Sequence, residues 1–310
     1  MDAQQPAHRH PPPGGRVRRV KPNVFAVVMS SGIVSIAAAD HGLDVVSVAL
    51  AVLALVALPV LMYLAAARWS TFDMGDIDTV MALYTYVAAC SVLTARFAGY
   101  PWSVWVFGPL ALSGWLALAP IVVRRMKRLG LTGMRDRARG LWELASVATS
   151  GLAVVTLAGG ILFWAFVFWV LALCVYVMIT SLVAWRAFVE PAVRRNVPSD
   201  HWILMGGAAI ATVAGEHIHS TLDPGPIAHA VLVVTVVTLG VATVQLVPLA
   251  ITGWRQLNDW PAVFPLGMYS AASFAVAVET GWHALVIVSQ VFLGIAVAAW
   301  LLTAATRVRR

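Results

Sequence analysis

Long uninterrupted runs of apolar residues alternate with short polar segments along most of the chain. Residues 45–67 and 161–185 are two such runs, and neither contains a charged residue. Each run is long enough for a helix to cross a hydrocarbon core of about 30 Å. Taken block by block, the pattern predicts ten spans, near residues 23–39, 45–67, 78–97, 103–123, 141–158, 161–185, 201–219, 227–252, 262–278 and 283–304.

The pattern and the composition together indicate the class of fold. The sequence lacks the alternating ten-residue segments that are typical of an outer-membrane barrel, so the backbone must satisfy its hydrogen bonds within helices. Apolar residues make up 60% of the chain and charged residues 11%, whereas soluble domains carry roughly 25% charged residues. We therefore predict an all-α integral membrane protein and exclude a water-soluble fold.

The formal charge of +7 follows from membrane topology and does not indicate a nucleic-acid partner. With the amino terminus in the cytoplasm, only Arg96 falls on the outer side, as the positive-inside rule expects for an even number of spans. The other 20 of the 21 basic residues are Arg9, Arg16, Arg18, Arg19, Lys21, Arg68, Arg124, Arg125, Lys127, Arg128, Arg135, Arg137, Arg139, Arg186, Arg194, Arg195, Arg255, Arg307, Arg309 and Arg310. This distribution predicts that both termini are cytoplasmic. The abundance of Arg, Ala and Val hints at a GC-rich bacterial genome, and hence at a bacterial cytoplasmic membrane.

The chain divides into one large domain and two short ends. Residues 1–21 are rich in Pro, Gly, His and Arg, and they lack the apolar stretch and cleavage site of a secretory signal. We expect them to form a disordered basic cytoplasmic tail, followed by a ten-helix domain at 22–306 and a basic cytoplasmic end at 307–310. Cys90 and Cys174 fall inside predicted spans without the spacing of a metal site. No metal or cofactor is expected.

Small and hydroxyl-bearing residues distinguish the odd-numbered spans from the even-numbered ones. Gly, Ser and Thr account for 20 of 91 residues in the odd set and 15 of 117 in the even set. Such residues allow close helix packing and offer hydrogen bonds, whereas helices facing lipid can be uniformly bulky. We therefore predict an inner ring of the five odd-numbered helices. The residues predicted to line its path are Ser30, Ser31, Gly32, Ser35, Thr149, Ser150, Gly206, Gly207, Thr212, Gly267 and Ser270.

Three stretches resemble the tellurite-resistance and dicarboxylate transporter family. They are KPNVFAVVMSSGIVSI at 21–36, WILMGGAAIATVAG at 202–215 and FPLGMYSAAS at 264–273. The family includes bacterial tellurite-resistance proteins, yeast malate and sulfite transporters and plant slow anion channels. The resemblance implies five helical hairpins around a central pore lined by the odd-numbered helices, commonly in a homotrimer of separate pores. It also implies a small anion as substrate: a C4-dicarboxylate, an oxyanion, or an anion like a halide or nitrate.

The resemblance further implies that Phe264 blocks the pore. A bulky neutral ring can exclude hydrated ions, and a hydrophobic constriction resists wetting, so a change of rotamer would open a path. Pro265 removes a backbone donor and can kink the helix so that the ring points inward. The alternative interpretation is an aromatic side chain that is simply packed beside a kink.

A few charged residues lie in or near the predicted spans. Arg96 could draw anions into an outer vestibule, or it could reach the lipid headgroups. Glu216 and His217 could accept protons and couple anion movement to proton movement, or they could lie in water at the boundary. An enzyme or sensor using these residues with His219, His229 and His283 as metal ligands is the alternative from another class, although their spacing fits no helical metal motif. Three further acidic residues are expected to be solvated or paired with arginines: Asp76, Asp78 and Glu143.

Overall fold

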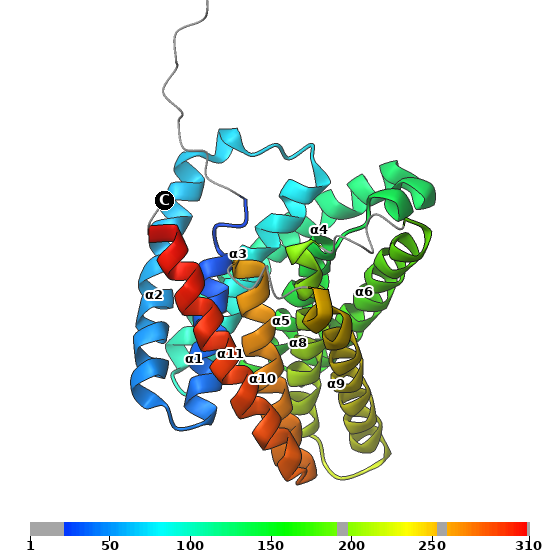
Figure 1. Ribbon diagram of the computed structural model, residues 1–310. Coiled ribbons are helices and arrows are strands. Elements are labelled where there is room, and N and C mark those ends of the chain that lie inside the picture. The colour runs from blue at the N-terminus through cyan, green and yellow to red at the C-terminus, as the bar shows by residue number, and fades with distance from the viewer. Residues whose placement is uncertain (1–21, 191–197, 253–258, 309–310) are drawn as a thin grey trace, which may run out of the picture.

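The computed structural model describes residues 22–190, 198–252 and 259–308, and within these ranges the chain is helical without strands (Figure 1). The predicted tail at 1–21 and residues 309–310 lie outside the described residues. Ten long helices coincide with the ten predicted spans. They are α1 (Ala26–Asp40), α2 (Asp44–Ala67), α3 (Ile77–Arg96), α4 (Pro101–Arg137), α5 (Leu144–Ala158), α6 (Leu162–Val189), α8 (Trp202–His219), α9 (Pro226–Thr252), α10 (Trp260–Thr280) and α11 (His283–Val308). Short 3₁₀ helices lie at η1 (Trp69–Thr71), η2 (Gly140–Glu143) and η3 (Ser199–His201).

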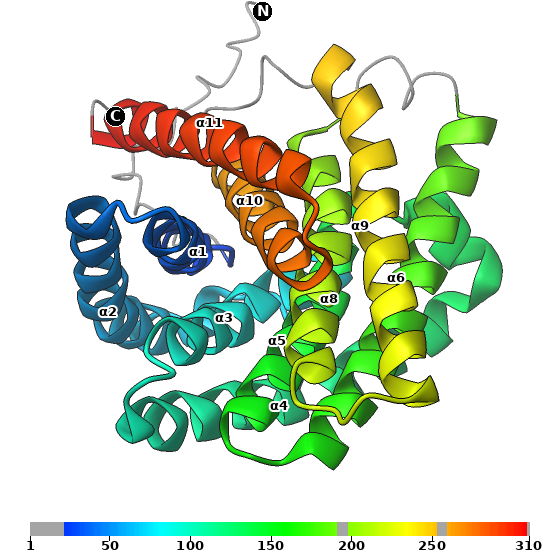
Figure 2. The same ribbon diagram turned by 90° about the horizontal axis from the view of Figure 1, so that it is seen from below.

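The ten helices form five antiparallel hairpins around a closed ring. The pairs α1–α2, α3–α4, α5–α6, α8–α9 and α10–α11 pack together. The first helix of each pair also packs against the first helix of its neighbours, in the order α1, α3, α5, α8, α10 and back to α1 (Figure 2). The predicted all-α fold, with five hairpins arranged about an inner ring of odd-numbered spans, is therefore confirmed.

Burial separates the two sets of helices. In their most apolar stretches, 72–83% of the residues of α3, of η2 with α5, and of α10 are buried inside the protein, against 22–28% for α2, α4, α6, α9 and α11. The outer helices present bulky apolar side chains such as Val56 and Phe188 outward, which suits a lipid environment. Eight helices are long and apolar enough to cross a bilayer, with α5 counted together with η2 as one stretch of 19 residues, Gly140–Ala158. The other two are inner helices: α1 has 15 residues, and α8 ends in the polar sequence EHIH.

Four residues, Asp78, Arg139, Trp142 and Asp200, tie the inner ring together where α3, α5 and α8 begin, and we call them the latch. Arg139 contacts Asp78 at 2.9 Å and Asp200 at 2.7 Å, and the buried Trp142 donates its indole N–H to Asp78 at 2.8 Å. Burial raises the pKa of Asp200, but hydrogen bonds from His201 and Arg139 and the charge of Arg139 bring it below its usual value. Asp200 is therefore ionised at neutral pH and forms an ion pair with Arg139.

The three acidic residues near the arginine-rich end of the bundle have different surroundings. Asp78 pairs with Arg139, as expected. Asp76 caps α3 by accepting the backbone N–H of Thr79 at 3.0 Å. The expectation for Glu143 was wrong, because its side chain is fully buried and none of the ion pairs among the described residues includes it.

Candidate functional site

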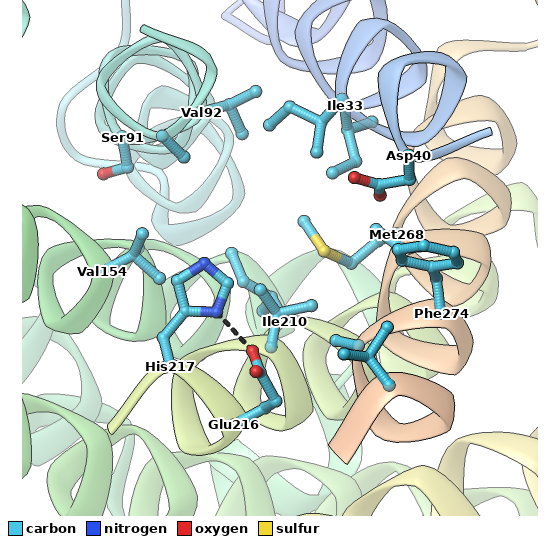
Figure 3. Close-up of a pocket in the computed structure, with 17 residues that line it drawn as sticks. Ile33, Asp40, Ser91, Val92, Val154, Ile210, Glu216, His217, Met268 and Phe274 are labelled. Carbon is cyan, nitrogen blue, oxygen red and sulfur yellow. Dashed lines mark hydrogen bonds and ion pairs between the residues drawn. The ribbon is translucent and has the colours of Figure 1, made fainter. Parts of the chain in front are cut away.

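The inner ring encloses a cavity of about 360 Å³ (Figure 3). All five inner helices contribute to its wall, each from near its midpoint towards its carboxyl end. The cavity therefore occupies the half of the ring that lies away from the latch. Its lining residues are Ile33, Ile36, Asp40, Ser91, Val92, Ala95, Gly151, Val154, Ile210, Val213, Glu216, His217, Met268, Ala271, Phe274, Ala275 and Val278.

The wall of the cavity is mainly apolar, and its charged groups lie near the helix ends. Asp40 is the last residue of α1, while Glu216 and His217 lie in the last turn of α8. The Nδ1 atom of His217 lies 2.6 Å from Oε2 of Glu216, the contact drawn in Figure 3. Any solute entering the ring from this end passes two carboxyl groups and an imidazole.

Asp40 was missed by sequence reasoning, although a signal for it exists. It follows Ile33 and Ile36 at spacings of seven and four residues, which places all three on one face of a helix. Both isoleucines line the same cavity. An acidic residue at the end of the first apolar run, in register with its inward face, is the pattern that would have identified it.

Arg96 lies behind the cavity wall. Its Nε donates to the hydroxyl of Ser35 on α1 at 2.7 Å, and its Nη2 donates to the hydroxyl of Ser47 on α2 at 2.9 Å. The guanidinium carbon also lies 5.7 Å from the centre of the Phe97 ring. The arginine therefore joins α3 to the first hairpin at the same end of the ring as Asp40.

Phe264 lies one helical turn from the cavity residue Met268, on the side of the cavity that faces the latch. Residues 264, 268, 271, 275 and 278 of α10 recur at helical spacing on one face, and the last four line the cavity. The Phe264 ring is fully buried. A Cβ atom added at Gly206 on α8 would lie 3.2 Å from its Cε1 and 3.0 Å from Cγ of Pro265. The ring thus lies between α10 and α8, and α10 continues through Pro265.

Most of the predicted path-lining hydroxyls bond to outer helices. Ser31 accepts from Trp300 of α11 at 2.9 Å, and Thr149 accepts from Trp115 of α4 at 2.9 Å. Three others bond within their own hairpins: Ser35 to the Ser47 carbonyl at 2.7 Å, Thr212 to the Thr238 hydroxyl at 3.0 Å and Ser270 to the Ser289 carbonyl at 2.7 Å. The structure places these five hydroxyls between the two layers of helices.

Four of the remaining candidates, Ser30, Gly32, Gly206 and Gly267, lie at contacts between inner helices. Ser30 donates to the Trp260 carbonyl on α10 at 3.4 Å. A Cβ at Gly32 would lie 2.6 Å from Val92, and one at Gly267 would lie 3.1 Å from Ile33. The hydroxyl of Ser150 is buried and has no hydrogen-bond partner among the described residues. Gly206 contacts Phe264, whereas Gly207 faces α6 and η2.

The histidines near the cavity do not converge on a metal site within the described residues. His217 contacts Glu216, while Nδ1 of His219 lies 2.7 Å from Oε1 of Glu279 on α10. The two neighbouring histidines therefore lie beside different carboxylates, although Nδ1 of His219 makes no hydrogen bond among the described residues. This geometry gives no support to the metal-dependent enzyme or sensor.

A bundle of helical hairpins whose inner helices surround a cavity of about 360 Å³ is an arrangement suited to a membrane channel or transporter. The family model described as voltage-dependent anion channel matches residues 19–308, and the chain belongs to that family. This confirms the resemblance carried by the three sequence stretches. The protein is accordingly a multi-pass membrane protein of a family of anion channels and transporters, which are not enzymes.

Two curated relatives are similar over part of the chain. Both are uncharacterized membrane proteins of Mycobacterium tuberculosis, one from strain CDC 1551 / Oshkosh and one from strain H37Rv. Each is 26% identical over 146 residues, which cover 41% of this chain and 72% of the relative.

Proposed function

We propose that this protein conducts a small anion across the bacterial cytoplasmic membrane, through the inner ring, with Phe264 as the gate. The observation that supports this most directly is the position of Phe264. Its ring is fully buried, shares the inward face of α10 with four cavity-lining residues and lies against Gly206. A ring in this position separates the cavity from the latch end of the bundle.

The proposed path combines a wide cavity with a narrow apolar constriction. A hydrophobic constriction excludes hydrated ions until the blocking side chain moves. The apolar wall below Asp40 and Glu216 places no fixed cation in the cavity, so an anion would bind weakly there and leave quickly.

The charge distribution supports an orientation. Under the positive-inside rule the latch end, near Arg124, Arg125 and Arg139, faces the cytoplasm and the cavity opens outward. Both termini are then cytoplasmic. The family resemblance further supports a homotrimer with one path per protomer, and a substrate that is a dicarboxylate, an oxyanion such as sulfite or tellurite, or an anion like a halide or nitrate.

An anion panel tests this proposal. Purified protein in liposomes is supplied with chloride, nitrate, sulfite and malate in turn, with and without an imposed pH gradient. We expect flux of at least one anion that follows its own electrochemical gradient. Absence of flux for every anion, from protein that is intact and monodisperse, would count against the proposal.

The second candidate is a proton-coupled carrier of a dicarboxylate or sulfite, favoured by the titratable groups in the cavity. Asp40, Glu216 and His217 all line it, so a proton and an anion would share one compartment. We expect Glu216→Gln to abolish the part of the flux that an imposed pH gradient drives, because the amide cannot accept a proton.

Glu279→Gln is the matched control for Glu216→Gln. Glu279 also lies at the carboxyl end of an inner helix and contacts a histidine, but it is outside the set of residues that line the cavity. It should leave the gradient-driven flux intact. If flux depends only on the anion gradient and survives Glu216→Gln, coupling through Glu216 is excluded.

A further inference from the structure

Glu143 is a carboxylic acid buried in the protein without an evident function. It is the last residue of η2 and directly precedes α5. Its side chain is fully buried, Oε1 has no hydrogen-bond partner among the described residues, and Oε2 receives a long contact of 3.5 Å from Thr180. The hydroxyl of Ser146 also lies near this carboxyl group, but it donates to the Ala172 carbonyl at 3.0 Å. Burying a polar group with so little compensation costs free energy. The position therefore calls for an explanation beyond stability.

The aliphatic part of Glu143 packs directly against the backbone of α8. A Cβ atom added at Gly207 would lie 2.8 Å from Cγ of Glu143 and 3.2 Å from Cδ2 of Tyr176. The absence of a side chain at Gly207 is what permits this approach. Glu143 and Tyr176 thus form a wall behind α8.

The preceding glycine faces the gate. A Cβ at Gly206 would meet Pro265 and Phe264 at 3.0 and 3.2 Å. Consecutive residues of an α-helix point about 100° apart, so the glycine pair presents one bare face to Phe264 and another to Glu143. One short segment of α8 backbone is therefore enclosed between the gate on one side and the buried acid on another.

The wall behind α8 is itself held in place. Gln245 of α9 donates to the Tyr176 hydroxyl at 2.7 Å. Glu143 directly follows Trp142, which the latch fixes to Asp78. These contacts leave the wall little freedom to follow a movement of α8, so the position of Glu143 sets how far α8 can move away from α10.

We propose that Glu143 is a positioning residue for the Phe264 gate. It fixes the Gly206–Gly207 segment of α8, against which the Phe264 ring closes. Shortening the Glu143 side chain leaves space behind Gly207, and α8 relaxes into that space. The Phe264 ring then loses the surface of α8 against which it packs. This inference rests on the proposed function, because it assumes that Phe264 closes the path.

The test measures anion flux in proteoliposomes for Glu143→Ala and Glu143→Gln, each with Phe264 intact and in the Phe264→Ala background. With Phe264 present, Glu143→Ala should raise flux about threefold or more. Glu143→Gln keeps the length and the contact with Gly207, so its flux should match the unmodified protein. In the Phe264→Ala background, Glu143→Ala should not raise the flux further, because no Phe264 ring remains for α8 to position.

Glu143→Asp provides a milder second variant, one methylene shorter, should the alanine protein fail to fold. Its flux should lie between those of the unmodified protein and Glu143→Ala, and should again depend on Phe264. No rise for either shortened variant, or the same rise with and without Phe264, would overturn the inference. If Phe264→Ala alone leaves flux unchanged, the proposed gate itself fails, so the two failures are distinguishable.

Discussion

Phe264→Ala should raise anion flux through the protein in liposomes by about tenfold or more, which corresponds to removal of a barrier of at least ~1.4 kcal/mol. The ring is fully buried on the inward face of α10, one turn beyond the cavity residue Met268. Truncation to a methyl group opens the constriction and removes the apolar surface that resists wetting. Efflux of a loaded anion, followed with an ion-selective electrode, measures the change.

Phe274→Ala is the control for the size and chemistry of the substitution. Phe274 is also on α10 and also lines the cavity, but it lies nearer the carboxyl end of the helix, with its ring centre 5.1 Å from that of His41. Its removal widens a part of the path that is already open, so flux should stay close to that of the unmodified protein. Unchanged flux for Phe264→Ala, in a monodisperse protein, is the outcome that removes Phe264 as the gate.

Gly140→Ala should destabilise the protein by about 1–3 kcal/mol, the usual cost of overpacking. A Cβ atom there would collide with the backbone oxygen of Asp200 and would lie 2.8 Å from Cα of His201. Both obstacles belong to backbone, which cannot rotate away as a side chain can. The substitution must therefore push η2 away from η3 and separate Arg139 from Asp200.

Thermal unfolding of the purified protein in detergent measures this effect, with Gly240→Ala on α9 as the matched control. A Cβ at Gly240 meets nothing within 4 Å, and alanine favours a helix over glycine by up to about 1 kcal/mol. The control should unfold at the same temperature as the unmodified protein or slightly higher. Equal unfolding temperatures for the Gly140 and Gly240 variants would show that the close contact between Gly140 and η3 does not determine the stability of the protein.

The membrane fold follows from the sequence because the bilayer restricts the possible structures. Ten charge-free or nearly charge-free blocks predict ten helices, and each one is present among the described residues. The excess of Gly, Ser and Thr in alternate blocks predicts the inner ring for a physical reason. Close packing on two sides requires small residues, and the lipid-facing helices are free of that requirement.

The direction in which each polar group points could be predicted much less well. A hydroxyl on an inner helix can line a path or bond to an outer helix, and the residue types along the sequence are the same in both cases. Thr212 and Ser270 were expected on the path, yet they join hairpins. Glu143 was expected to be solvated or paired with an arginine because it lies near the cytoplasmic end of a predicted span, whereas η2 turns it inward against Gly207. Such orientations depend on packing between helices distant in sequence.

The central claim is that the inner helices surround a path for anions that Phe264 closes. The most direct measurement is the reversal potential of the Phe264→Ala protein in a planar bilayer under a tenfold gradient of the potassium salt of an anion that the liposome panel shows to be conducted. We predict a current whose reversal potential lies close to the equilibrium potential of that anion. A reversal potential close to that of potassium, or a bilayer that stays silent although the protein is inserted, would contradict the account.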